Sequence, residues 1–281
     1  MKRWADSGLL PTIKTAGGHR RFRAEDVAVF RRTGLRETGR PAARSSVNAP
    51  DATAPALRGG TKFEETAEVF YEAILAGRSD EAAAILVSLH LGGAGVALLA
   101  DRVLCPAMRR VGDLWHRGEL SVAQEHVASR AALEALHALR ASLHAREAHG
   151  RRAVCCAVEE DFHELPVHVA ALTLEANGWE VINLGTSTPF YALAEAVERF
   201  APRVVCVAST ILEGLDRAAR EYADVRKSAT RSGARVVLGG EGFAGEDVRR
   251  RFPAELYAEE FRQLETFAVS LSEEGAGGVE S

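Results

Sequence analysis

A short apolar run, Ala153-Val154-Cys155-Cys156-Ala157-Val158, leads directly into Glu159-Glu160-Asp161-Phe162-His163. Six consecutive apolar residues predict a strand that is buried on both faces, as in a parallel sheet covered by helices. The chain then presents carboxylates and an imidazole before the next helix is expected to begin. Ligands of open parallel sheets bind at the carboxyl ends of the strands, so we expect Glu160, Asp161 and His163 to lie in a binding site.

The same alternation of apolar runs and helices continues from residue 151 to residue 272. Strands are expected at 153–158, 181–184, 204–208 and 236–238, with a fifth near 256–257; helices are expected at 166–176, 190–200, 212–232 and 245–251, with a last one ending near 271. Apolar strands separated by helices predict an α/β domain built on a doubly wound, flavodoxin-like (Rossmann-like) parallel sheet. Residues 273–281 are expected to be a disordered tail.

Residues 62–147 predict an all-α domain, a four-helix bundle. The first helix is expected from Phe63 to Leu75, the second from Ser79 to Leu89 and the third from Gly95 to Trp115. Ser121-Val122-Ala123-Gln124 is a capping box that starts the fourth helix. Leucines at helical spacing give that helix one apolar face; they are Leu133, Leu136, Leu139 and Leu143. Short connections predict that neighbouring helices run antiparallel.

The N-terminal residues carry a charge opposite to that of the rest of the chain. Residues 1–44 hold 11 Lys/Arg and 4 Asp/Glu, a net charge of +7, whereas the whole chain has a net charge of −4, which leaves −11 for the remainder. This asymmetry indicates that one end contacts a polyanion, and a solvated basic arm is the alternative. Residues 37–61, rich in Pro, Ala, Gly, Ser and Thr, predict a flexible linker.

Residues 1–36 contain a turn followed by cationic side chains. Gly17-Gly18 allows a tight two-residue hairpin turn, and the strand after it presents arginines that suit phosphate contacts. The order Lys2-Arg3-Trp4, Gly8-Leu9-Leu10-Pro11, Thr15 and Gly17–Phe22 resembles the winged helix-turn-helix of the MerR regulator family. That family has a further helix and turn before this point, so we expect an incomplete helix-turn-helix here. The resemblance implies contacts with double-stranded DNA through Lys2, Arg3, His19, Arg20, Arg21 and Arg23.

Two later strand ends carry residues that complement Asp161 and His163. Ser209-Thr210-Ile211 follows the third expected strand and Gly239-Gly240 follows the fourth. A hydroxyl at one strand end can hydrogen-bond a buried aromatic nitrogen, and glycines at the next let a flat group lie against the backbone. Glycine pairs at strand ends are more often simple turns, so each element alone is a weak signal, but together they surround one crevice.

This set resembles the cobalamin-binding domain shared by methionine synthase and the corrinoid mutases, whose signature is D-x-H-x-x-G, then S-x-L, then G-G. The resemblance implies that His163 is the lower axial ligand of cobalt and that the cofactor's nucleotide tail is buried beside Ser209, Ile211, Gly239 and Gly240. Asp161 can accept the other imidazole N–H and so fix the ring. Pro166 replaces the last signature glycine, and we expect it to be the first residue of the next helix.

A further motif lies in the bundle, where Trp115-His116 precedes Glu125-His126. An indole can cover the upper face of a corrin ring and exclude water; a core tryptophan beside a surface histidine is the alternative. The W-x9-E-H spacing resembles the light-sensing cobalamin repressors of the MerR family, the CarH and LitR type. The resemblance implies that Trp115 and Glu125 contact the adenosyl group, with His126 beside them, and that His116 takes the upper cobalt position after light cleaves the cobalt–carbon bond.

The resemblance covers nearly the whole chain and implies a photoreceptor repressor, not an enzyme. Its cofactor would be adenosylcobalamin, with methylcobalamin as the alternative. We expect a DNA-bound homo-oligomer in darkness, a dimer or tetramer, that falls apart in light. Two other functions remain open: a corrinoid carrier module for methyl transfer, and a regulator that uses the same fold through protein contacts without light or cofactor.

The composition argues against several other classes. No apolar run approaches the roughly 18 residues that span a bilayer, and the basic N-terminus lacks the apolar segment of a signal peptide, so we expect a cytoplasmic protein with no membrane contact. The four cysteines contain no C-x-x-C pair, which argues against a zinc site. Cys155 and Cys206 fall inside expected strands and should be buried there as small apolar residues.

Overall fold

The computed structural model describes residues 13–14, 20–21, 60–143 and 150–273. The chain separates into two units, residues 1–54 and residues 55–281. In the first unit, β1 (Ile13–Lys14) pairs antiparallel with β2 (Arg20–Arg21), with Lys14 opposite Arg20. The predicted hairpin pairing is therefore confirmed, but this register is offset by one residue from the one that a two-residue turn at Gly17-Gly18 would give. The other residues predicted to contact DNA lie outside the described residues; they are Lys2, Arg3, His19 and Arg23.

Residues 60–143 form four helical segments, in agreement with the predicted bundle. They are α3 (Gly60–Leu75), α4 (Ser79–Leu91), a third segment made of α5 (Val96–Leu99), the π-helix η1 (Ala100–Leu104) and α6 (Cys105–His116), and α7 (Val122–Ser142). The capping box at Ser121 is present: its side chain accepts from the N–H of Gln124, whose side chain accepts from the N–H of Ser121. Helix α3 begins at Gly60, two residues inside the range expected to be linker.

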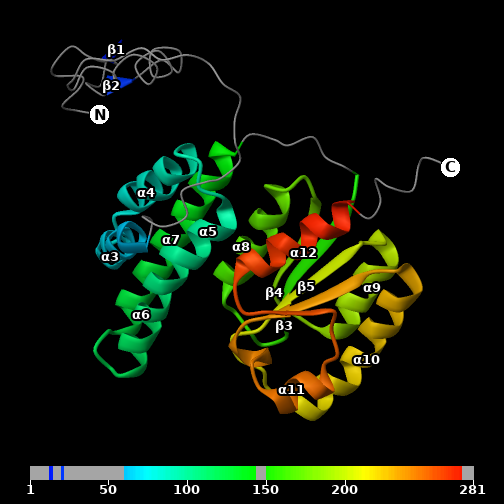
Figure 1. Cartoon of the computed structure of the whole chain (residues 1–281). Helices are drawn as coiled ribbons and strands as arrows, with labels where there is room; N and C mark the ends of the chain where they lie inside the picture. The colour runs from blue at the N-terminus through cyan, green and yellow to red at the C-terminus, as the bar shows by residue number, and fades with distance from the viewer. Residues whose placement is uncertain (1–12, 15–19, 22–59, 144–149, 274–281) are drawn as a thin grey trace, which may run out of the picture. The chain divides into compact units, whose positions relative to one another are not determined.

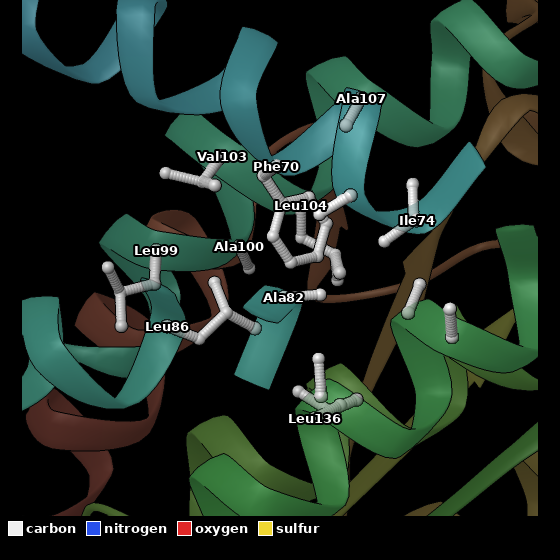
Figure 2. Close-up of a cluster of buried hydrophobic side chains, with 14 of the residues drawn as sticks. Phe70, Ile74, Ala82, Leu86, Leu99, Ala100, Val103, Leu104, Ala107 and Leu136 are labelled. Atoms are coloured by element: carbon white, nitrogen blue, oxygen red, sulfur yellow. The ribbon is translucent and has the colours of Figure 1, made fainter. Parts of the chain in front are cut away.

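One apolar core holds the four segments together (Figure 2). Phe70 and Ile74 of α3 meet Leu86 of α4, Val103 of η1 and Leu136 of α7, and all five are buried. Buried alanines complete this core; they include Ala82, Ala100, Ala107, Ala128, Ala132 and Ala135. This packing accounts for the apolar spacing seen in the sequence, and it places Trp115 at the C-terminal end of α6, outside the core.

Residues 150–273 contain a five-stranded parallel sheet, as predicted. Its strands are β3 (Arg152–Val158), β4 (Glu180–Thr188), β5 (Val204–Ala208), β6 (Arg235–Gly239) and β7 (Leu256–Ala258), in the order β4-β3-β5-β6-β7. This is the flavodoxin-like order, in which the chain adds strands first on one side of β3 and then on the other. The point where the direction reverses lies between β3 and β5.

Helices cover both faces of the sheet (Figure 1). α8 (Glu164–Glu175) and α12 (Phe261–Glu273) pack on one face; α9 (Phe190–Phe200) and α10 (Leu215–Ser232) pack on the other, and η2 (Glu241–Phe243) and α11 (Glu246–Arg251) follow β6. Cys155 and Cys206 are buried beneath α8 and α12, as predicted. No helix in the described part of the chain is both long enough and apolar enough to cross a membrane.

The bundle and the sheet share a packed boundary within the second unit. Val169 and Leu172 of α8 belong to the core of the bundle. Arg140 at the end of α7 pairs with Glu175 at the end of α8, with 2.5 Å between guanidinium nitrogen and carboxylate oxygen. Asp101 of η1 accepts hydrogen bonds from the first N–H groups of α12. These contacts fix where the bundle meets the sheet.

One prediction about the start of α8 is wrong. Pro166 was expected to be the first helical residue, but α8 begins at Glu164, which makes Pro166 the third. The first N–H groups of an α-helix have no acceptor within the helix, so a proline without an N–H is tolerated throughout the first turn. His163 is consequently the residue that immediately precedes the helix.

Candidate functional site

Asp161 is the most densely bonded residue of the candidate site. It follows β3 and is 2% exposed. One carboxylate oxygen, Oδ1, accepts from the backbone N–H of His163 at 3.0 Å and lies 2.7 Å from its Nδ1; the other, Oδ2, accepts from the N–H of Thr210 at 2.5 Å. Burial alone would raise the pKa of this carboxyl, but the hydrogen bonds from His163 and Thr210 outweigh it and lower the pKa. Asp161 is therefore held as a carboxylate.

The side chain of His163 is oriented by that carboxylate while remaining 53% exposed. The hydrogen bond to Asp161 is the main reason why the pKa of the imidazole is raised; burial opposes it, and the charges of Asp161 and Glu125 add to the increase. Because Nδ1 is engaged with Asp161, Nε2 is the nitrogen left for an external partner. Glu125 belongs to α7, so the bundle and the sheet both act on this imidazole.

Ser209 lies at the end of β5 in close contact with a glycine-rich loop after β6. Its N–H donates to the carbonyl of Gly239 at 2.9 Å, its carbonyl accepts from Gly242 at 2.8 Å, and its hydroxyl donates to the carbonyl of Ile211 at 3.0 Å. Gly240 has φ +97°, and a Cβ there would lie 2.3 Å from the carbonyl oxygen of Ser209; a Cβ on Gly242 would lie 2.2 Å from its Oγ. These glycines are required by Ser209 itself.

The predicted bundle residues lie around the start of α7 and the end of α6. Glu125 is paired with its neighbour His126, with 2.5 Å between Oε2 and Nδ1, and accepts from the hydroxyl of Ser129 at 2.5 Å. Trp115 is 47% exposed, and His116 is exposed as well. Among the described residues, the side chains of Trp115 and His116 form no hydrogen bond, ion pair or ring contact.

The structure thus brings together two groups of predicted residues. Asp161, His163, Ser209, Ile211, Gly239 and Gly240 meet at the carboxyl edge of β3, β5 and β6, where the strand order reverses. Glu160 lies in the loop after β3 that also carries Asp161 and His163, and its φ is +66°. Glu125 and His126 form the second group, linked to the first through the charge of Glu125 on His163. Among the residues that the structure describes, Trp115 and His116 form no hydrogen bond, ion pair or ring contact with the first group.

Three residues of the site were missed by sequence reasoning. Thr210 acts through its backbone N–H, which leaves no trace in side-chain chemistry. Gly242 could have been found, because Gly240-x-Gly242 repeats the small residue on the side that approaches Ser209. Ser187 of β4 contacts the loop that carries Glu160 and Asp161, and nothing about its type or spacing singled it out.

Comparison with known proteins identifies the family. Residues 66–140 match a family model described as a B12 binding domain, and residues 151–260 match a second model with the same description. The HTH-type transcriptional repressor CarA of Myxococcus xanthus is 31% identical over 204 residues, which cover 72% of this chain and 67% of CarA. The chain belongs to the CarA/CarH family of cobalamin-binding regulators.

A second member of the CarA/CarH family supports this assignment. The HTH-type transcriptional repressor CarH of Myxococcus xanthus is 36% identical over 146 residues, so the chain spans 46% of the length of CarH. Both named relatives are transcriptional repressors. Among solved structures, the monomethylamine corrinoid protein of Methanosarcina barkeri shares the fold with a TM-score of 0.62, at 15% identity, over 76% of this chain and 99% of that one.

The candidate site of this CarA/CarH family member fits a cobalt-containing corrinoid. A metal whose other ligands come from a macrocycle needs a single protein nitrogen, and His163 offers Nε2 with its ring fixed by Asp161. The backbone of Gly239 and Gly240 lies beside the buried hydroxyl of Ser209, which is 1% exposed. The indole of Trp115 and the side chain of Phe162, 71% exposed, provide accessible apolar surface for a large planar group.

Proposed function

We propose that this protein is a light-responsive transcriptional repressor that uses adenosylcobalamin as its chromophore. The observation that supports the proposal most directly is the environment of His163. A carboxylate from the sheet holds Nδ1 at 2.7 Å, and a carboxylate from the bundle, Glu125, is close enough to raise the pKa of the same imidazole. We infer that a cofactor bound to Nε2 contacts both halves of the unit.

In this proposal His163 would hold the cobalt through Nε2, and Asp161 would keep the ring in the orientation that binding requires. Ser209, Ile211, Gly239 and Gly240 hold the nucleotide tail at the sheet edge. Trp115, Glu125 and His126 surround the upper face, where an indole excludes water and a carboxylate can accept a hydrogen bond from the ribose of the adenosyl group. The bound cofactor would supply a cobalt–carbon bond that light can break, and His116 would be available as a further ligand for the cobalt.

Assembly of the protein into an oligomer would connect the bound cofactor to DNA binding. We propose that the dark form is a homo-oligomer, a tetramer or a dimer, which binds double-stranded DNA in the cytoplasm through basic residues that include Arg20 and Arg21. Each subunit makes few phosphate contacts, so the affinity for DNA depends on several subunits acting together. Loss of the oligomer in light then releases the operator. The protein would thus have two states, the oligomer and the separate subunits, and the intact cofactor would favour the oligomer because it binds that state better.

The test uses the full chain and adenosylcobalamin in darkness. We expect a bound-cobalamin absorption spectrum and a larger particle by size-exclusion chromatography, with reversion to a smaller particle after green light. His163→Ala should lose the spectral signature of the coordinated imidazole and the change in size. His90→Gln is the matched control. It removes an imidazole that belongs to α4 and not to the site, and whose Nδ1 lies 3.0 Å from the carbonyl oxygen of Ala94.

Absence of bound cobalamin after dark incubation would end the proposal. Binding without any light-dependent change in size or DNA affinity would favour one of the two other functions. A corrinoid carrier would transfer the methyl group of methylcobalamin to a thiol acceptor. A regulator that works through protein contacts alone would bind its partner equally well with Ala at position 163.

A further inference from the structure

The end of strand β4 is distorted where it passes the candidate site. Cys155 of β3 is opposite Asn183, and Val158 is opposite Thr188, so β4 uses five residues where β3 uses three. Two bulges absorb the difference. The side chain of Asn183 accepts from the N–H of Gly185 at 2.8 Å, and Gly185 has φ +81°. Bulges re-aim the residues that follow them, and here the residue re-aimed toward β3 is Ser187.

Ser187 is joined to the loop after β3 by two reciprocal hydrogen bonds. Its hydroxyl accepts from the N–H of Glu160 at 3.1 Å, and its own N–H donates to the carbonyl of Asp161 at 2.9 Å. Ser187 and Glu160 are both non-glycine residues in the left-handed region, with φ +49° and +66°. Such conformations cost about 1–3 kcal/mol each and persist where surrounding contacts enforce them. Each residue supplies one of the contacts that holds the other.

This pair completes the fixation of Asp161. The carboxylate of Asp161 is held from the β5 side by the N–H of Thr210, while its backbone is held from the β4 side by Ser187. The backbone between Val158 and His163 is thereby fixed on two sides. Without the β4 contact, Asp161 would retain its carboxylate partners, but the peptide groups on either side of Glu160 would be free to rotate.

We propose that Ser187 is a positioning residue for His163, acting through the backbone of Glu160 and Asp161 to keep Nε2 aimed at the cobalt of a bound corrinoid. The inference rests on the proposed function. The chain of contacts runs from the Ser187 hydroxyl to the Glu160 N–H, then through Asp161 to the imidazole. Mutation of groups that orient a metal-binding histidine commonly weakens metal binding about 10–100-fold, and we expect the lower end of that range because Ser187 acts one step further away.

The test compares three substitutions in the full chain. Ser187→Gly removes the hydroxyl and accommodates a positive φ without strain. Ser187→Asn keeps a side-chain acceptor and tolerates the left-handed region, so it should restore the wild-type behaviour. Thr186→Ala is the local control, because it removes a neighbouring hydroxyl that bonds no described residue. Melting curves of the cofactor-free proteins establish that each variant folds.

Two measurements follow. In the cofactor-free protein, amide hydrogen exchange at Glu160 should be at least tenfold faster in Ser187→Gly than in wild type, with Thr186→Ala unchanged. In the loaded protein labelled with 15N-histidine, electron paramagnetic resonance of the cobalt(II) form reports a coordinated histidine nitrogen by two-line splitting of the cobalt lines, whereas the unlabelled nitrogen of the cofactor's own tail gives three-line splitting. We expect the ratio of coordinated to uncoordinated cobalt to fall about tenfold in Ser187→Gly and to recover in Ser187→Asn.

The outcomes separate the two proposals. If wild-type protein binds no cobalamin, the proposed function and this inference both fail. If wild-type protein binds cobalamin through His163 and Ser187→Gly shows the same coordinated fraction, the inference is overturned and the proposed function stands. Unchanged exchange at Glu160 in Ser187→Gly overturns it as well, because the hydroxyl would then not hold the loop.

Discussion

Asp101 in the π-helix of the bundle accepts a hydrogen bond from the backbone N–H of Phe261, the first residue of α12, at 2.8 Å. Its second oxygen accepts from the N–H of Arg262 at 3.0 Å. A side chain 160 positions earlier in the chain therefore caps this helix. Burial raises the pKa of the Asp101 carboxyl against the opposing effect of these two hydrogen bonds.

Asp101→Ala should destabilise the second unit by about 1–2 kcal/mol, because it leaves two N–H groups at a helix start without their acceptor. Asp101→Asn keeps one acceptor oxygen and should cost less. Urea unfolding measures the change, and amide exchange at Phe261 and Arg262 should accelerate in the alanine variant. The control is Asp113→Ala on the exposed face of α6. If Asp101→Ala and Asp113→Ala lowered the free energy of unfolding equally, the hydrogen bonds of Asp101 to α12 would not stabilise the boundary between bundle and sheet.

Gly242→Ala should destabilise the protein by about 1–3 kcal/mol, the usual cost of overpacking. Its new Cβ would lie 2.2 Å from Oγ and 2.8 Å from Cβ of Ser209. Ser209→Gly removes both atoms, so the double variant should recover most of the loss. Gly112→Ala serves as the control: a Cβ there meets nothing within 4 Å, and alanine in a helix should stabilise by about 1 kcal/mol. Additive effects in the double variant would contradict the contact with Ser209.

Stability should decrease on acidification because of His168, which lies on α8 against α7. Burial lowers the pKa of this imidazole, the nearby His137 and Arg140 lower it further, and Glu164 opposes them; the His137 and His168 rings are 5.5 Å apart. The folded protein therefore resists protonation more than the unfolded chain does. The stabilisation is complete above the ordinary histidine pKa of about 6.5 and is lost as the pH falls toward the lower folded value.

His168→Phe keeps a ring at this boundary and cannot titrate. Between pH 7.5 and pH 5.5, the melting temperature of wild type should therefore fall further than that of His168→Phe, by on the order of 2 °C. Parallel melting profiles for wild type and His168→Phe would show that this imidazole does not contribute to the pH dependence.

The cysteines should be unreactive in the native state. Burial raises the pKa of the Cys105 thiol to about 12 and the pKa of the Cys156 thiol further; the pKa of Cys155 is raised by a hydrogen bond with Cys206 together with burial. Because the thiolate is the reactive form, a colorimetric thiol reagent at pH 8 should react slowly with the folded protein. In denaturant all four should react at once. Rapid reaction of one native thiol would indicate local opening around it.

Local signals in the sequence were sufficient for most of the element boundaries. The capping box at Ser121 depends on residues three apart, so it is fully visible in the sequence, and α7 begins there. Strands β3 and β5 were predicted because both of their faces are apolar. Asp161 and His163 were recognised because the end of a buried parallel strand is a place where ligands bind, and the predicted hydrogen bond between them is present.

The features that were missed depend on contacts between distant parts of the chain. Gly185 and Ser187 lie beyond the strand that was expected at 181–184, but pairing with β3 extends β4 to Thr188 through two bulges. The Gly240-x-Gly242 repeat is visible in the sequence, but the residue that requires glycine at position 242 is Ser209, 33 residues earlier, and that contact cannot be read from local pattern. Pro166 was predicted to be the first residue of α8 but is the third. The sequence does not distinguish these positions, because proline suits every position of a helix's first turn.

The π-helical segment η1 decides the direction in which the residues after it face. An α-helix turns by about 100° per residue, and a π-helical turn accommodates one residue more than an α-helical turn. If the same five residues, Ala100–Leu104, were wound as an ordinary α-helix, α6 would be rotated about its axis by about 100°. Trp115 and His116 would then point a quarter-turn away from their present azimuth while their own sequence stayed the same. The facing direction of this end of the bundle is thus set by how the backbone is wound at a point more than two turns upstream.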